Sequence, residues 1–371
     1  MSSELRVCQL ITGLGYGGAE NMVVDLVDAV DDVTFSVGYM GQEDALAAEI
    51  LTTGVSVHAL GERIRFDPTA FARLVRLFRR VECDVVHLHL PYAQTVGRLA
   101  AALAGIDGVV STQHNVPSNY HPVTRTTERL TRCLDDVTVA VSQGVERAFT
   151  GTAHVPGKSD DDWCTIYNGI DVDGFERSVR EAVTESVEES FGIDGNETVF
   201  LSVGRYVPVK RQEMLIEAFE QSGVDDGRLF LVGHGPREAT LRDAVRDRGL
   251  SERVHVTGRV PTVEPYYALA DVFVSASGGE GLPITFLEAM AAGLPVIGTQ
   301  IAGVDEVVVE NETGYLCRQD ANAIGAAMAK LCDPDRQQSL GGAGRRRVAA
   351  HFSIEQMAGS YADLYRCVVS K

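Results

Sequence analysis

Residues 272–299 read VFVSASGGEGLPITFLEAMAAGLPVIGT: an apolar run, a glycine-rich loop, a segment of helical length and a second apolar run. The pattern predicts strands over Val272–Ala276 and Pro295–Thr299, with a helix over Pro283–Ala292 between them. Proline is favoured in the first turn of a helix, which suits Pro283. A strand, a helix and a second strand in succession predict two parallel strands joined by a helical crossover.

The same alternation of short apolar runs and helical segments extends along the whole chain. In the second half it predicts further strands at Thr198–Gly204, Arg228–Gly233 and Val254–Thr257, and further helices at Gln212–Gln221, Arg237–Arg248, Val263–Ala270 and Ala321–Cys332. In the first half it predicts strands at Leu5–Ile11, Val33–Met40, Val55–Leu60, Val85–Leu88, Val109–Gln113, Asp136–Ala140 and Cys164–Tyr167, and helices at Ala19–Val30 and Ala70–Val81.

A chain of 371 residues is too long for one ordinary domain. The sequence therefore predicts an α/β protein with two Rossmann-like, doubly wound parallel-sheet domains that face each other across a ligand-binding cleft. The charged segment 176–196 is expected to be a linker or a solvated helix. It separates an N-terminal domain over 1–175 from a C-terminal domain over 197–352, which is followed by a final helix over 353–371.

Composition excludes several classes of function. Acidic residues outnumber basic ones 52 to 33, and the net charge of −19 disfavours nucleic acid as a partner. The surface is poor in lysine and acidic, as in proteins adapted to high salt. The seven cysteines are scattered and include no Cys-x-x-Cys pair, which argues against a disulfide framework and a zinc site.

Targeting signals are also missing from the sequence pattern. No run of about 18 apolar residues is present, and the N-terminus lacks the basic region of a signal peptide. We therefore expect a cytoplasmic protein, with peripheral contact at the inner face of the membrane left open.

The first glycine-rich loop follows the first strand and opens a helix. Gly13, Gly15 and Gly18 fit the dinucleotide-binding pattern G-x-G-x-x-G, but that pattern also requires an acid at the end of the second strand. Here the second strand ends at Gly41, and Glu43 comes late, in a turn. The loop by itself indicates either an anion-binding site or a tight turn.

A second cluster follows the first strand of the C-terminal domain. Arg205 and Lys210 lie five residues apart on one loop. An arginine fork and a lysine point charge at this spacing can clamp a diphosphate, although two unrelated surface cations would give the same pattern.

A third cluster contains two carboxylates. Glu280 lies in the glycine-rich loop, and Glu288 lies on the helix that begins near Pro283. One acid is then expected at the mouth of the cleft and the other behind it, within reach of ribose hydroxyls. The helix N-terminus between them directs its dipole at a departing phosphate.

Taken together, the motifs resemble the retaining glycosyltransferase family 4 group of GT-B enzymes along nearly the whole chain. The Glu280–Glu288 spacing, followed by an alanine-rich continuation, is the most specific of them. The Tyr206 region departs from the commoner leucine-rich form of its loop. In chain order, the motifs that carry the resemblance are Gly17-Gly18-Ala19-Glu20, Asp84-Val85-Val86-His87-Leu88-His89, Val141-Ser142, Asn168-Gly169-Ile170-Asp171, Val203-Gly204-Arg205 with Lys210, Leu231-Val232-Gly233-His234-Gly235-Pro236, Val256-Thr257-Gly258, and Glu280 through Glu288 into Ala289-Met290-Ala291-Ala292-Gly293.

The resemblance implies a role for each site residue. It makes His114, Glu280, Arg205 and Lys210 catalytic, with the diphosphate held by the two cations and the sugar hydroxyls held by Glu280. It places His89 and Asn115 on the acceptor side, in the N-terminal domain, and has the last helix cross back to that domain. The residues that it assigns to donor binding are Gly17, Gly18, Arg205, Lys210, Gly233, Gly281, Leu282, Pro283 and Glu288.

The implied reaction is a retaining transfer of a hexose-type sugar from a UDP- or GDP-linked donor. The implied acceptor is a glycan, a lipid-linked molecule or a small molecule, and no cofactor or metal is expected. The pairs Asp171/Asp173 and Asp333/Asp335 match the Asp-x-Asp metal pattern, but such matches arise freely in a chain this acidic. A GT-B nucleotide-sugar epimerase stays open as an alternative. So does an NAD(P)-dependent oxidoreductase, which would leave the cations and acids of the C-terminal domain without a role.

Overall fold

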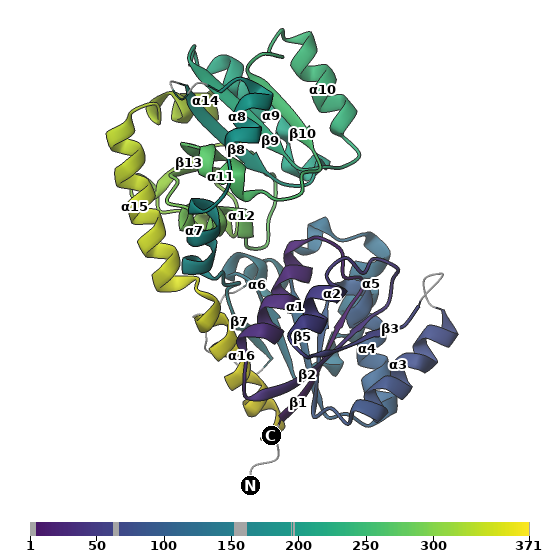
Figure 1. Cartoon of the computed structure of the whole chain (residues 1–371). Coiled ribbons are helices and arrows are strands. Elements are labelled where there is room, and N and C mark those ends of the chain that lie inside the picture. The colour runs from purple at the N-terminus through teal and green to yellow at the C-terminus, as the bar shows by residue number, and fades with distance from the viewer. Residues whose placement is uncertain (1–4, 62–66, 152–161, 194, 196, 371) are drawn as a thin grey trace. The chain divides into compact units, whose positions relative to one another are not determined.

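The computed structural model describes residues 5–61, 67–151, 162–193, 195 and 197–370. The chain divides into two compact units, which Figure 1 shows in colours that follow the sequence. Unit 1 comprises the chain up to Gly169 together with the residues from Ile354 onward. Unit 2 comprises Ile170–Ser353.

Unit 1 is built on a seven-stranded sheet in the order β3-β2-β1-β4-β5-β6-β7. All of its neighbouring strands are parallel. The strands are β1 (Leu5–Ile11), β2 (Val33–Tyr39), β3 (Ser56–Ala59), β4 (Val85–His89), β5 (Gly108–Gln113), β6 (Val137–Ala140) and β7 (Trp163–Thr165). The helices are α1 (Gly18–Ala29), α2 (Ala47–Thr52), α3 (Pro68–Val81), α4 (Pro91–Ala104), α5 (Pro122–Thr131), α6 (Gln143–Thr150) and α16 (Ile354–Val369), with 3₁₀ turns at Pro117–Asn119 and Arg132–Leu134.

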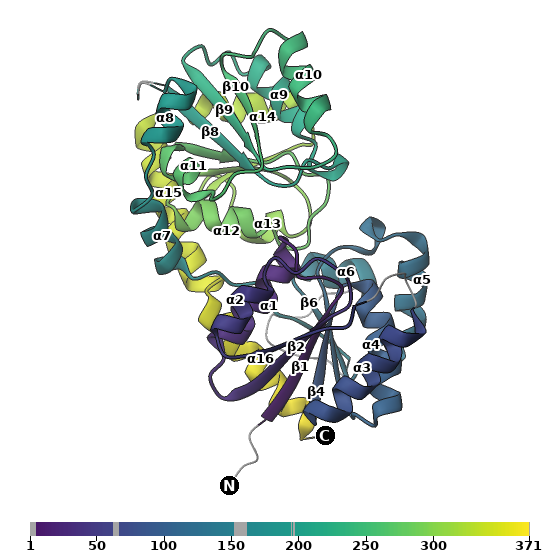
Figure 2. The same cartoon turned by 45° about the vertical axis from the view of Figure 1, so that its right-hand side comes forward.

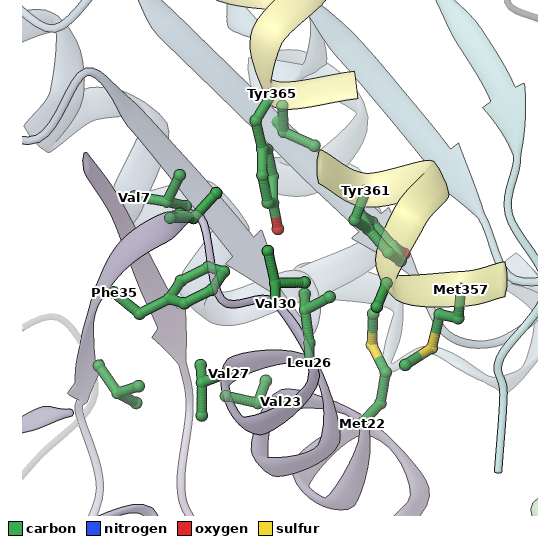
Figure 3. Close-up of a cluster of buried hydrophobic side chains, with 14 of the residues drawn as sticks. Val7, Met22, Val23, Leu26, Val27, Val30, Phe35, Met357, Tyr361 and Tyr365 are labelled. Carbon is green, nitrogen blue, oxygen red and sulfur yellow. The ribbon is translucent and has the colours of Figure 1, made fainter. Parts of the chain in front are cut away.

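Helices cover both faces of this sheet, which explains its continuous apolar strands. In Figure 2, α3 and α4 lie on one side of β1, β2 and β4, and α1, α2 and α16 lie on the other. Each side has its own buried cluster of apolar side chains. Figure 3 shows the cluster in which Leu26 and Val27 of α1 pack near Tyr361 and Tyr365 of α16.

Unit 2 has a six-stranded sheet in the order β10-β9-β8-β11-β12-β13, again entirely parallel. Its strands are β8 (Thr198–Val203), β9 (Gly227–Val232), β10 (Val254–Gly258), β11 (Val272–Val274), β12 (Val296–Thr299) and β13 (Gly314–Cys317). Its helices are α7 (Val172–Arg180), α8 (Glu185–Phe191), α9 (Gln212–Gln221), α10 (Glu238–Asp247), α11 (Glu264–Leu269), α12 (Ile284–Ala291), α13 (Val304–Val307), α14 (Ala321–Lys330) and α15 (Pro334–His351), with a 3₁₀ turn at Pro208–Lys210.

The structure thus has the predicted class, two Rossmann-like domains with parallel sheets. The chain passes from unit 1 to unit 2 between Gly169 and Ile170, earlier than the boundary expected at residue 175. The segment expected to be a linker contains α8 and the end of α7, and α7 packs against other helices of unit 2. Among the described residues, no helix combines the length and the apolar character needed to cross a bilayer.

Candidate functional site

Four loops of unit 2 meet at the carboxyl edge of its sheet. They follow β8, β9, β11 and β12, and backbone hydrogen bonds join the first three of them. Tyr206 N–H donates to the carbonyl of His234 at 2.9 Å, and Gly278 N–H donates to the carbonyl of Val209 at 2.7 Å. In open α/β sheets this edge is where ligands bind.

Two of the predicted catalytic residues form an ion pair at this edge. Lys210 Nζ lies 2.6 Å from Glu280 Oε1, and their side chains are only 24% and 12% exposed. The loop after β8 carries Lys210, and the loop after β11 carries Glu280, so the contact joins residues 70 positions apart in the sequence. Arg205 is exposed on the first of these loops, and its carbonyl accepts a hydrogen bond from Gln212 Nε2 at 2.9 Å.

Gly233 occupies a position where the backbones of two loops touch. Its φ is +148°, and a Cβ atom there would lie 2.0 Å from the carbonyl oxygen of Gly204. Only glycine allows this approach. The contact brings the turn after β9 against the loop that carries Arg205 and Lys210.

Gly303 makes a similar close contact with the loop that contains Glu280, and replacing it tests the importance of that contact. Its φ is +82°, and a Cβ atom would lie 2.1 Å from the carbonyl oxygen of Gly281. A positive φ costs a residue other than glycine about 1–2 kcal/mol. We expect Gly303→Ala to lower the free energy of unfolding by more than that, because the Gly281 carbonyl must also move, and we expect it to weaken donor binding.

The matched control is Gly54→Ala, since Gly54 has a φ of +83° and no atom within 4 Å of the added Cβ. Urea unfolding of both variants gives the comparison. Equal losses of stability in the two variants would contradict a clash at Gly281.

The second glutamate, Glu288, is paired with a tyrosine. Tyr267 of α11 donates its hydroxyl to Glu288 Oε2 at 2.7 Å. The pKa of Glu288 is raised, mainly because the carboxyl group is buried. The hydrogen bond from Tyr267 opposes this shift, and the nearby Glu264 carboxylate adds to it. Tyr267 itself is buried, and its pKa is well above the usual value, first because of burial and then because of Glu288. The hydrogen bond from the tyrosine fixes the orientation of the carboxylate.

The turn between the two glutamates prepares the start of α12. Gly281, Leu282 and Pro283 are buried, and Pro283 is the residue that precedes the first helical position, Ile284. The helix, Ile284–Ala291, is one residue shorter at each end than the predicted Pro283–Ala292. The N-terminus of a helix carries a partial positive charge, which stabilises a negative charge placed beside it.

In unit 1, the predicted histidines come together at the ends of β4 and β5. His89 Nδ1 lies 3.0 Å from His114 Nε2, and His89 is fully buried whereas His114 is partly exposed. Burial lowers the pKa of His114 to about 3, and burial lowers that of His89 well below its usual value. Both rings are therefore neutral at physiological pH. Asn115 uses its side-chain oxygen locally, accepting from the N–H of Val116 at 2.9 Å.

The first glycine loop carries acidic neighbours. Gly17 is the N-cap of α1 and Gly18 its first residue. A Cβ atom on Gly15 would lie 2.7 Å from a carboxylate oxygen of Glu43, and one on Gly17 would touch the carboxylate of Glu20. Two carboxylates thus lie beside the loop that the sequence assigns to donor binding.

The Asp-x-Asp pairs belong to helix ends. Asp171 accepts from the N–H of Gly174 and caps α7, and Asp333 accepts from the N–H of Asp335 and caps α15. Asp173 forms an ion pair with Arg345. Within the described parts of the chain, no group of three or more His, Cys, Asp or Glu residues is placed to hold a metal ion.

Sequence reasoning missed several residues that support the site. Tyr267 lies within a predicted helix, but nothing in the sequence pairs it with Glu288, 21 positions later. Arg211, the residue after Lys210, belongs to no motif that would single it out. Its guanidinium packs on Gly278 and hydrogen-bonds Gln319, so it braces the glutamate loop. Lysine is rare in this chain and arginine is common, so Lys210 stands out in the sequence and Arg211 does not.

Comparison with known proteins agrees with this geometry. The sequence profile of the family "Glycosyltransferase Family 4" matches residues 16–173, and that of "Glycosyl transferases group 1" matches residues 183–347. The chain is 33% identical over 316 residues to a GDP-mannose-dependent alpha-(1-6)-phosphatidylinositol monomannoside mannosyltransferase of Mycobacterium tuberculosis, covering 81% of this chain and 80% of the relative. It is 26% identical over 308 residues to an N-acetyl-alpha-D-glucosaminyl L-malate synthase of Bacillus anthracis, covering 81% and 79%.

Solved structures show the same fold. The Anabaena protein HepE, in complex with UDP-glucose, superposes with a TM-score of 0.85 at 20% identity over 98% of this chain and 100% of that chain. Sucrose-phosphate synthase from Thermosynechococcus elongatus gives a TM-score of 0.83 at 20% identity, with 99% of each chain covered. With both family profiles matched and a relative above 30% identity, the chain belongs to the glycosyltransferase family 4 group, the glycosyl transferases group 1, and has the GT-B fold.

Proposed function

We propose that this glycosyltransferase moves a hexose from a UDP- or GDP-linked donor to its acceptor with retention of configuration and without a metal ion. The observation that carries the proposal is the contact between Lys210 and Glu280, 2.6 Å apart at the carboxyl edge of the unit 2 sheet and beside the start of α12. A cation for the diphosphate and an acid for the sugar hydroxyls meet there on two separate loops.

Most of the residues that bind the donor in this proposal belong to unit 2. Arg205 and Lys210 bind the diphosphate together with the N–H groups of Gly281 and the first turn of α12, and Leu282 and Pro283 shape that turn. Glu288, oriented by Tyr267, accepts hydrogen bonds from the ribose hydroxyls. Gly233 keeps the turn after β9 in close contact with the loop that carries both cations.

The reaction breaks the glycosidic C–O bond, so negative charge develops on the leaving diphosphate. Arg205, Lys210 and the α12 N-terminus stabilise that charge, as preorganised electrostatic groups do in other enzymes. The acceptor hydroxyl attacks from the same face and is assisted by the departing phosphate. His114, which lies 3.0 Å from His89, contacts the reacting sugar. Gly17 and Gly18 contribute to donor binding, and His89 and Asn115 line the acceptor side in unit 1.

The relatives indicate which classes of acceptor are found among similar proteins. One relative is named for a phosphatidylinositol monomannoside and another for L-malate, so both lipid-linked and small acceptors occur among similar proteins. We propose a saccharide, lipid-linked or small-molecule acceptor for this chain, at a cytoplasmic location with peripheral contact to the inner membrane face. Nucleic acid is excluded from the proposal because of the net charge of −19.

The test is a screen of common nucleotide-sugars for thermal stabilisation and for hydrolysis, followed by product analysis with candidate acceptors. A donor that stabilises the wild-type protein, but not Arg205→Ala or Glu288→Ala, supports the assigned site. Transfer that survives a chelator supports metal independence, and the anomeric configuration of the product reports retention. Conversion of the donor to an epimer in the absence of any acceptor, or binding of NADH alone, would replace the proposal with one of its two alternatives.

A further inference from the structure

A continuous hydrogen-bond network lies behind His114 in unit 1. We call it the His114 network. From His114 Nε2 it passes to His89, then to Gln9, Tyr365, His87, Thr112 and Tyr361, with donor–acceptor distances of 2.7–3.1 Å. Apart from His114, its members are fully buried, each with a relative exposure of 0%. It connects strands β1, β4 and β5 to the last helix of the chain, α16.

The direction of each hydrogen bond follows from the amide of Gln9. Gln9 Nε2 donates to the hydroxyl of Tyr365 at 3.0 Å, so the amide oxygen faces His89 Nε2 at 2.7 Å. An amide oxygen can only accept, and His89 Nε2 therefore carries the proton. Because His89 is neutral, its Nδ1 is an acceptor, and the atom that can donate to it is His114 Nε2.

The other arm of the network is consistent with this direction. Since Tyr365 accepts from Gln9, its own proton is available for His87 Nδ1 at 2.7 Å. His87 is neutral because burial lowers its pKa well below the usual value, so its proton lies on Nε2 and points to Thr112 Oγ1 at 2.7 Å. Each contact along the network then joins one donor to one acceptor, as hydrogen bonds between buried polar groups require.

We infer that Gln9 and Tyr365 are positioning residues that fix His114 in the tautomer with its proton on Nε2 and a bare Nδ1. The catalytic importance of His114 rests on the proposed function. The hydrogen-bond geometry that fixes its tautomer does not depend on that function. The orientation of one histidine ring nitrogen is commonly set by the hydrogen bond that the other one makes. Here that control comes from Tyr365 on helix α16, 251 positions along the chain from His114.

Figure 3 shows why α16 can do this. Tyr361 and Tyr365 project from one face of α16 into the interior of unit 1, one helical turn apart. Both are fully buried, and both hydroxyls belong to the network. Only Tyr365 lies between Gln9 and His87, whereas Tyr361 ends the network at Thr112.

This difference supplies a matched pair of variants. Tyr365→Phe removes the acceptor of the Gln9 amide, so the amide loses its preferred orientation, and His89 and His114 are expected to populate both tautomers. Tyr361→Phe removes a hydroxyl of equal burial from the same helix and leaves the contacts of Gln9 intact. Gln9→Met, which removes both the donor and the acceptor of the side-chain amide, is the second test variant.

The experiment measures the ¹⁵N chemical shifts of the histidine rings in the full chain, assigned by loss of signal in His87→Gln, His89→Gln and His114→Gln. We expect protonated Nε2 on His114 in the wild type and in Tyr361→Phe, and a mixture in Tyr365→Phe and Gln9→Met. With a donor identified, kcat should fall roughly tenfold in Tyr365→Phe while KM for the donor changes little, since about one hydrogen bond is misplaced.

An unprotonated His114 Nε2 in the wild type would overturn the inference, and so would identical spectra for the two phenylalanine variants. These outcomes are separate from failure of the proposed function. A chain that transferred no sugar would still show the tautomers, and normal transfer with unchanged tautomers in Tyr365→Phe would refute only the inference.

Discussion

Lys210→Ala is expected to lower kcat/KM for sugar transfer by about 10²–10³-fold, the loss found when one preorganised charge-stabilising group is removed. Lys210 lies at the meeting point of two loops, and its ammonium group is only 2.6 Å from Glu280. The charge that it would neutralise develops on the leaving diphosphate. Because that charge is greater in the transition state than in the ground state, kcat should fall more than donor affinity.

The variant has a second effect, because Glu280 loses its partner. Its carboxylate is 12% exposed, so the unpaired charge remains partly desolvated and repels a diphosphate. Combining Lys210→Ala with Glu280→Gln should therefore lower the rate by less than the product of the two single effects. A double-mutant cycle on the rate of transfer measures this coupling.

Arg242→Ala provides the control in the same unit. Arg242 pairs with Glu238 at 3.0 Å on helix α10, but the arginine side chain is 51% exposed. Surface pairs of this kind contribute little, and no loop of the proposed site depends on it. Transfer by Lys210→Ala at a rate within about threefold of Arg242→Ala would contradict the assigned role, since electrostatic catalysis at one position is worth far more than that.

The sequence predicted the sheets well because both are covered on two faces. Strands such as Leu5–Ile11 are continuous apolar runs, and the structure has β1 with the same bounds. Helix α9 likewise has the predicted bounds, Gln212–Gln221. Such segments are specified locally, by side-chain pattern and by the loops that flank them.

Elements specified by packing were harder to predict. Strand β13, Gly314–Cys317, was missed because its four residues include glycine and follow a polar turn. Gly314 lies there because a Cβ atom would be 2.0 Å from the carbonyl of Val296 on β12. Helix α15 was missed as well, since its sequence is rich in arginine and glycine and shows little apolar periodicity. Gly341 on this helix fits closely against the carbonyl of Gly293.

The site followed the same division. The cations and acids of unit 2 were visible in the sequence because they lie in glycine-rich loops after strands. Tyr267, which hydrogen-bonds Glu288, and Tyr365, which hydrogen-bonds His87, were not visible, because both come from helices whose register no local pattern reveals. Contacts such as Gln9 with Tyr365, 356 positions apart, depend on how α16 folds back onto the first sheet.

Acidification is expected to destabilise unit 1 strongly between about pH 6.5 and pH 5. Burial lowers the pKa of His87 and of His89 well below the usual value, and burial lowers that of His114 to about 3. In the unfolded chain a histidine takes up a proton near pH 6.5, so below that pH the unfolded state binds more protons than the folded one. Stability conferred by the neutral rings is therefore complete above the unfolded pKa and is lost as the pH falls toward the folded pKa.

The size of the effect is comparable to the stability of a domain. Each histidine that stays neutral in the folded state lowers the free energy of unfolding by about 2 kcal/mol at pH 5 relative to pH 7, so three of them lower it by roughly 6 kcal/mol. The free energy of unfolding of a typical domain is about 5–15 kcal/mol. Trp163, the single tryptophan of the chain, lies in β7 of unit 1, so its fluorescence reports the unfolding of that unit. Urea titrations at pH 7 and pH 5 give the two free energies.

Replacing one ring isolates its contribution. His87→Gln lowers stability at pH 7, because the bonds to Tyr365 and Thr112 are altered, but it should reduce the loss between pH 7 and pH 5 by about one third. The exposed residue His351 of unit 2 supplies the surface control, His351→Gln. A wild-type free energy that changes by less than about 1 kcal/mol over this range would mean that the three rings are not held neutral. Their hydrogen-bond directions, and with them the tautomer of His114, would then lose their physical basis.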